Sequence, residues 1–137
     1  MTLHVELLMP DRSLWSGEAS MVIAKTMDGD VGILPGRAPV FGILSPGSMV
    51  RIQPLAVDEE VSGAEVRAAV RDGFLSVTND RVSILASLGL LADDVNVSSV
   101  QADLDTATAE AGSPAAAEES VEVKYARAQL RAAGEQA

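Results

Sequence analysis

The chain lacks cysteine, and it has a single histidine and few aromatic residues. Without cysteine it forms no disulfide and no thiolate metal site. One histidine, His4, excludes a multi-histidine metal site and disfavours a Ser-His-Asp triad. Aromatic residues make up 3% of the chain. A hydrophobic core must therefore be built from Val, Leu, Ile, Met and Ala. Because the chain also lacks cysteine and has one histidine, we expect no catalytic residue and no cofactor.

Basic residues are also scarce, with 10 Lys and Arg against 20 Asp and Glu and a net charge of −10. Neutralising nucleic-acid phosphates requires clustered Lys and Arg, so we expect no nucleic-acid partner. No apolar run approaches the roughly 20 residues that span a bilayer, which predicts no direct membrane insertion.

What the chain does contain is a conspicuous segment at residues 28–39, DGDVGILPGRAP. Its three glycines and two prolines fix unusual backbone angles, whereas Ile33 and Leu34 are large and apolar. These features predict an ordered loop, with Ile33 and Leu34 as anchors that fill the core. Asp28-Gly29-Asp30 resembles the start of a calcium loop, but aliphatic residues follow where further oxygen ligands are needed, so we expect no metal site.

Two hydrophobic periods divide the chain into residues 1–91 and 92–137. Up to about residue 91, short alternating runs such as Leu3-His4-Val5 are separated by turn signals, including Asn79-Asp80. This pattern predicts an antiparallel β-sandwich or barrel. After residue 92 the period becomes helical and predicts a hairpin of helices at about 98–111 and 114–133. Ser98 and Gln101 suit a capping box, and Gly112 suits a helix end.

Four blocks, in order, resemble the epsilon subunit of F-type ATP synthase, with actinobacterial features. They are residues 14–19 (LWSGEA), 29–39 (GDVGILPGRAP), 44–52 (LSPGSMVRI) and 72–86 (DGFLSVTNDRVSILA). The resemblance implies a β-sandwich of about ten antiparallel strands followed by a C-terminal α-helical hairpin. It also implies a non-catalytic rotor subunit in the central stalk, peripheral on the cytoplasmic face of the plasma membrane. There it would contact the gamma subunit, the c-ring and the alpha/beta head, and restrain ATP hydrolysis.

The resemblance further implies contact residues. Asp28, Asp30 and Arg37 are candidates for the c-ring or gamma contact, where family members usually have His in place of Arg37. An ordered crossover between sheets, with Asp28 and Asp30 in a solvated turn, is the alternative interpretation of this loop.

In the C-terminal segment, the resemblance makes Lys124, Arg127 and Arg131, together with Tyr125, candidates for regulatory contact with the alpha/beta head. The three cations share one helix face. A solvated face that balances nearby Glu side chains is the alternative.

Some relatives bind ATP through a motif at the start of the first C-terminal helix. Here Asn96 and Ser99 stand where that motif has Asp and Arg. Loss of the Arg removes a charge-assisted phosphate contact, so we expect no ATP binding. A second function remains open from the sequence: a free-standing β-sandwich that binds a small molecule beneath a helical lid.

Overall fold

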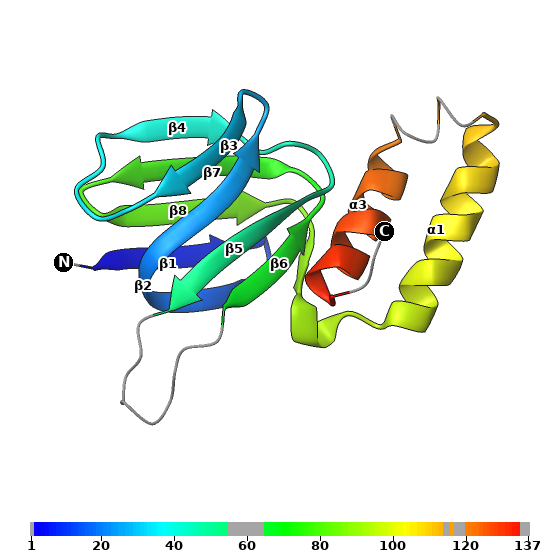
Figure 1. Ribbon diagram of the computed structural model, residues 1–137, viewed down its shortest axis with the longest axis horizontal. Coiled ribbons are helices and arrows are strands. Elements are labelled where there is room, and N and C mark those ends of the chain that lie inside the picture. The colour runs from blue at the N-terminus through cyan, green and yellow to red at the C-terminus, as the bar shows by residue number, and fades with distance from the viewer. Residues whose placement is uncertain (1, 55–64, 114–115, 117–119, 135–137) are drawn as a thin grey trace.

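The computed structural model describes residues 2–54, 65–113, 116 and 120–134. Strands come first and two helices follow (Figure 1). The strands are β1 (Leu3–Leu8), β2 (Ser13–Thr26), β3 (Gly29–Ile33), β4 (Val40–Ile43), β5 (Ser48–Pro54), β6 (Val66–Val70), β7 (Gly73–Thr78), β8 (Arg81–Ala86) and β9 (Gly89–Leu91). A 3-10 turn, η1 (Ala92–Asp94), leads into α1 (Val97–Ala111), and α3 (Val121–Ala132) is the last element of the described residues.

Alternation along the strands builds the core, as the sequence predicts. On β1, Leu3, Val5 and Leu7 are buried, whereas His4 and Glu6 are exposed. The same alternation is seen on β8, because successive side chains of a strand point to opposite faces of the sheet. It fails on β6, where Ala68, Ala69 and Val70 are all buried because Ala69 on the outer face packs against α3. The resulting core is almost entirely aliphatic. Its largest fully buried members include Leu3, Leu7, Ile33, Leu44, Ile52, Leu75 and Ile84.

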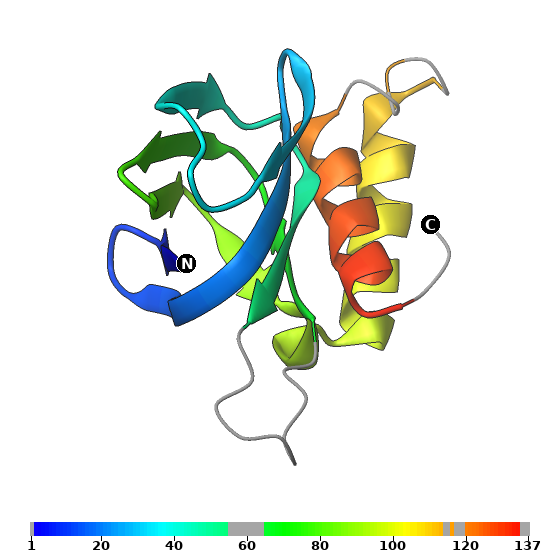
Figure 2. The same cartoon turned by 60° about the vertical axis from the view of Figure 1, so that its left-hand side comes forward.

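The strands run in the order β4-β7-β8-β1-β2-β5-β6-β9, and β3 pairs with β2. The first half of the long β2 pairs with β1, and its second half pairs with β3 and β5. The sheet therefore curls over itself into the two layers of a β-sandwich (Figure 2).

One detail differs from the prediction of about ten antiparallel strands. Nine strands lie in the described residues. One pair, β1 with β8, is parallel, so the expectation of an entirely antiparallel sheet is wrong at that place. Hairpin signals predict only pairs between neighbouring strands, whereas β1 and β8 come together when the sandwich closes. The Asn79-Asp80 hairpin is confirmed: both residues have positive φ, 50° and 63°, as a type I′ turn requires.

The helices form a hairpin on one side of the sandwich. Helix α3 packs on β5 and β6, and α1 packs on α3, so α3 lies between the sandwich and α1 in both views (Figures 1 and 2). Val100 and Leu104 of α1 meet Ala126 and Leu130 of α3. Within the described residues, no helix has the length and apolar character needed to cross a membrane.

The start of α1 corrects one local prediction. Asn96, not Ser98, is the N-cap, and its Oδ1 accepts a hydrogen bond from the Ser99 amide at 3.0 Å. Asn caps helices as well as Ser does, and the helix begins one residue earlier than predicted. Gln101 instead donates to Asp105 at 3.3 Å. At the other end, Gly112 has a φ of 83° and ends the helix as predicted.

The second helix also differs from the predicted span of 114–133. Ser120 has an extended backbone and caps α3 by accepting from the Val123 amide at 3.4 Å, so α3 begins at Val121. The Ser113 hydroxyl accepts from the Ala116 amide at 3.1 Å, the bond expected of the predicted N-cap. Residues 114–115 and 117–119 of the predicted helix lie outside the described part of the chain.

Candidate functional site

The first half of the predicted contact loop is a hairpin that joins β2 to β3. The Thr26 hydroxyl donates to the Gly29 carbonyl at 2.9 Å and accepts from the Asp28 amide at 3.2 Å, which holds the turn tight. Asp28 and Asp30 are exposed at its tip, and Asp30 lies opposite Lys25 on β2. Both acids are therefore free to meet a partner.

The second half of the loop supports one predicted anchor and refutes the other. Ile33 is fully buried, but Leu34 is 57% exposed, so its prediction as a core anchor is wrong. Strand β3 ends at Ile33, and Leu34 opens a turn in which the Arg37 amide donates to the Leu34 carbonyl at 3.3 Å. Arg37 is exposed beyond that turn.

Sequence reasoning missed the residue that holds this turn. The Gly36 amide donates to Asp80 Oδ1 at 2.7 Å, across 44 residues of sequence. Asp80 was recognisable only as part of the β7–β8 hairpin, and no local pattern links it to Gly36. The structure thus joins the two turns into one end of the sandwich.

Toward the end of β4, β7 and β8 that lies away from the Asn79-Asp80 turn, exposed apolar side chains form a continuous row on the outer face of these strands. Ile43 lies opposite Phe74, and Phe74 lies opposite Leu85. The Phe41 ring packs on Phe74 with centroids 5.6 Å apart. Phe41 is 69% exposed, and the others are also exposed. We call Phe41, Ile43, Phe74 and Leu85 the apolar row.

The apolar row is continued by Met27, which is exposed in the β2–β3 turn and whose amide donates to the Ile43 carbonyl at 2.9 Å. Contiguous exposed apolar surface of this kind marks a binding face. The sequence did not predict the apolar row. The alternation of residues shows which side chains share a face of a strand, but it does not show which strands lie next to one another in the sandwich.

The helical hairpin contacts the sandwich through small side chains. Ala69 of β6 and Ala128 and Ala132 of α3 form a buried cluster, with Met49 and Tyr125 at its edge. Burial raises the pKa of the Tyr125 phenol, while the nearby Arg71 opposes this. Tyr125, predicted as a regulatory contact, is thus part of the interface between α3 and the sandwich.

Two further contacts define how closely α3 approaches. A Cβ on Gly47 would lie well inside 3.0 Å of the backbone of Lys124 and Tyr125, so only glycine fits at that turn. Arg71 of the sandwich and Glu122 of α3 form an ion pair at 2.6 Å. The pKa of Glu122 is lowered, first by its own backbone amide and then by Arg71.

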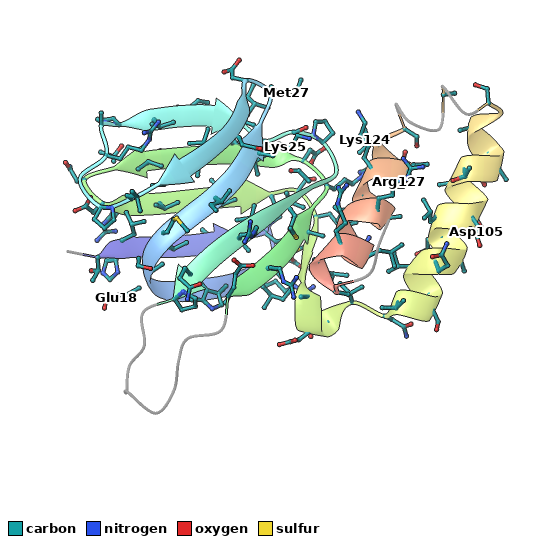
Figure 3. All side chains as sticks on the ribbon, viewed as in Figure 1. Glu18, Lys25, Met27, Asp105, Lys124 and Arg127 are labelled. Carbon is teal, nitrogen blue, oxygen red and sulfur yellow. The ribbon has the colours of Figure 1, made fainter. Side chains whose placement is uncertain are left out.

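The three predicted cations of α3 do come together in the structure. Lys124, Arg127 and Arg131 line a groove of about 500 Å³ between α3 and the sandwich, together with Lys25 and Arg51. Figure 3 shows Lys124 and Arg127 on α3 beside the sandwich, with Lys25 on β2 in the same view. We call these five residues the basic groove.

A second hollow lies between α1, α3 and the sandwich. Its lining includes three acids, Asp103, Glu110 and Glu122, against one base, Arg71. Asn96 is occupied in capping α1 and is not part of that lining. Phosphate groups would meet mostly negative charge there.

No group of three or more His, Cys, Asp or Glu side chains in the described residues is arranged to hold a metal ion. His4 is exposed on β1.

Comparison with known proteins places these features in a family. A family profile described as "ATP synthase, Delta/Epsilon chain, beta-sandwich domain" matches residues 2–89. The chain is 50% identical over 132 residues to the ATP synthase epsilon chain of Thermobifida fusca, covering 96% of this chain and 91% of that one. It is 41% identical over 113 residues to the epsilon chain of Streptomyces griseus, covering 82% and 86%.

A solved structure shares the fold at much lower identity. One chain in the Euglena gracilis mitochondrial ATP synthase structure, described as OSCP/F1/c-ring in rotational state 1, superposes with a TM-score of 0.76 at 18% identity. The match covers 98% of this chain and 82% of that chain. The combination of sandwich and helices is therefore an arrangement already seen in solved structures.

Proposed function

The chain belongs to the ATP synthase epsilon-chain family, and from this premise we propose that it is a non-catalytic rotor subunit of the F-type enzyme. In this role its sandwich joins the gamma subunit to the c-ring, and its C-terminal helices regulate ATP hydrolysis. The subunit is then held at the cytoplasmic face of the membrane through the ring, without insertion of its own.

The apolar row is the observation that carries this proposal. Phe41 is 69% exposed, and aromatic side chains bury roughly 150–250 Å² each. At about 25 cal/mol per Å², complete burial of Phe41 alone would stabilise a complex by about 3 kcal/mol. Two aromatic and two aliphatic exposed side chains in one row suit a permanent partner, for which the gamma subunit is our assignment.

The test is the affinity of the full chain for the gamma subunit of the same enzyme. We expect Phe41→Ala with Phe74→Ala to weaken that complex by about ten- to a hundredfold. Val97→Ala, which shortens an exposed aliphatic side chain on α1, is the matched control and should leave affinity unchanged. Equal affinities for both variants would remove the gamma assignment.

We assign the c-ring contact to the turns at the two ends of β3. Asp28 and Asp30 project from the β2–β3 hairpin, and Arg37 follows the turn that Asp80 holds. Charges at the rim of an interface act chiefly on association rates and specificity. Asp28→Asn with Asp30→Asn should therefore slow assembly with the ring more than it speeds dissociation.

We propose that regulation depends on whether α3 is docked on the sandwich. Its apolar contact is built largely from alanines, so little apolar area holds the hairpin in place. Released helices would carry Lys124, Arg127 and Arg131 to acidic surfaces of the alpha/beta head. In that state they oppose rotation in the hydrolytic direction.

Nucleotide is not part of this proposed regulation. The hollow beside α1 is lined mainly by acids, and Ser99 supplies no guanidinium at the start of the helix. We therefore propose that ATP has no site between the two helices of this subunit.

A further inference from the structure

Asp80 occupies a turn position at which glycine would be less strained. It lies in the turn between β7 and β8 with a φ of 63°. Glycine is the preferred residue at the second position of a type I′ turn, because a left-handed backbone is strained for a residue that has a Cβ. Strain that is kept where glycine would relieve it indicates that the side chain has a further use.

That use is a hydrogen bond to a distant segment. Asp80 Oδ1 accepts from the Gly36 amide at 2.7 Å, and the Asp80 carbonyl accepts from the His4 amide at 2.8 Å. The residue thus ties the β3–β4 connection and the start of β1 to the β7–β8 hairpin, and Figure 1 shows all three at one end of the sandwich. A hydrogen bond to a carboxylate is shorter and stronger than one between neutral groups.

The β3–β4 connection has little else to hold it by hydrogen bonding. Two of residues 34–39 are prolines, which have no amide hydrogen to donate. Within the described part of the chain, this segment has one other hydrogen bond, from the Arg37 amide to the Leu34 carbonyl. That bond is long, at 3.3 Å, and joins the segment only to itself. The direction in which Arg37 leaves the sandwich therefore depends chiefly on Asp80.

We propose that Asp80 is a positioning residue for the c-ring contact, acting through Gly36 to fix the direction of Arg37. This role rests on the c-ring contact proposed above for Arg37. The Arg37 side chain is exposed and follows Gly36 directly, so the backbone at Gly36 decides where the cation points. A cation that is already oriented before the ring arrives loses less conformational freedom on binding, and this preorganisation favours association.

Two measurements test the two steps separately: hydrogen exchange of the Gly36 amide in the isolated full chain, and the rate at which its complex with the gamma subunit associates with the purified c-ring. Asp80→Gly removes the carboxylate but keeps the hairpin, because glycine suits that turn, and it should speed Gly36 exchange by about tenfold. It should also slow association by about threefold. Asp80→Asn keeps an oxygen acceptor and tolerates the left-handed backbone, so both measurements should stay within about twofold of the unsubstituted chain.

Arg37→Gln distinguishes positioning from a direct contact between Asp80 and the ring. Arg37→Gln alone should slow association by about three- to fivefold. If Asp80 acts through Arg37, adding Asp80→Gly to Arg37→Gln should slow association by less than about 1.5-fold more. Asp11→Gly removes an acid from the exposed turn at the other end of β1, and it should change neither measurement.

Three results would overturn the proposal. These are unchanged Gly36 exchange in Asp80→Gly, unchanged association of that variant with the ring, or equal slowing by Asp80→Gly in the presence and absence of Arg37. Slower association in Arg37→Gln but not in Asp80→Gly would remove the positioning role and leave the c-ring contact in place. Association that Arg37→Gln does not slow would remove the contact itself, and the positioning role with it.

Discussion

Gly47 is the residue at which a single methyl group should release the helical hairpin. It lies in the turn before β5 with a φ of +61°, and an added Cβ would overlap the backbone of Lys124 and Tyr125. Those atoms belong to a helix and cannot rotate away, as the end of a flexible side chain would. Gly47→Ala therefore forces α3 away from the sandwich.

Gly47→Ala has two energetic costs: one lowers the stability of the sandwich, and the other weakens docking of α3. The left-handed backbone costs about 1 kcal/mol, and it does so whether α3 is docked or not, so it lowers the stability of the sandwich. The overlap exists only in the docked state and costs about 1–3 kcal/mol. Docking should therefore weaken by about 5- to 150-fold.

Gly112→Ala provides the control for backbone strain. Gly112 has a φ of +83°, and no described atom outside its immediate neighbours lies within 4 Å of a Cβ placed there. This variant carries the left-handed cost without the overlap. A difference between the two variants therefore reports the contact with α3.

Hydrogen exchange of the α3 amides is the direct assay, with ATP hydrolysis by the assembled complex as the functional one. In Gly47→Ala, α3 should exchange faster than in Gly112→Ala, and hydrolysis should be more strongly inhibited because the released helices reach the head. Slow exchange in Gly47→Ala, equal to that of the control, would refute the proposed close approach.

Three other predictions concern the helices and the outer face of the sandwich. Phe41→Ala should weaken the gamma complex while barely changing the unfolding temperature of the free chain, because the side chain is mostly exposed. The pKa of Glu122 is lowered first by a hydrogen bond from its own backbone amide and then by Arg71. Only the Arg71 pair depends on docking, so its contribution to docking is present at neutral pH and is lost as pH falls below the usual carboxyl value of 4.5 towards the lowered pKa. The protection factors of the α3 amides, which allow for the slower intrinsic exchange in acid, should therefore fall on acidification, and Glu122→Gln should remove that part of the pH dependence. Calorimetry with MgATP should detect no saturable binding to the full chain, and saturable binding would contradict the absence of a nucleotide site between the helices.

The fold was largely predictable because the spacing of hydrophobic residues and the residues that form turns are properties of short segments of sequence. Alternation in β1 and the Asn79-Asp80 hairpin correctly predicted strands and turn, and Gly112 correctly marked the end of α1. The parallel pairing of β1 with β8 was not predictable, because it depends on closure of the whole sheet. The cap at Asn96 was missed because two good capping residues stand close together.

The functional surfaces were harder to predict, since each is assembled from distant segments. Leu34 was predicted as buried from its hydrophobicity, but its place one residue after Ile33 at the end of β3 turns it outward. The apolar row requires the register of three strands, and Lys25 and Arg51 of the sandwich face the cations of α3 only after the hairpin docks. Only the clustering of Lys124, Arg127 and Arg131 followed from their spacing in sequence.

The central claim is that this chain is a rotor subunit whose C-terminal helices restrain hydrolysis. The most direct test is the rate of ATP hydrolysis by the reassembled complex with the full chain and with a chain lacking residues 93–137. Binding of each form to the gamma subunit should be checked in parallel. We predict that removal raises the rate at least about fivefold while gamma binding persists, the lower end of typical allosteric coupling. Equal rates from complexes that retain both forms equally would contradict the account.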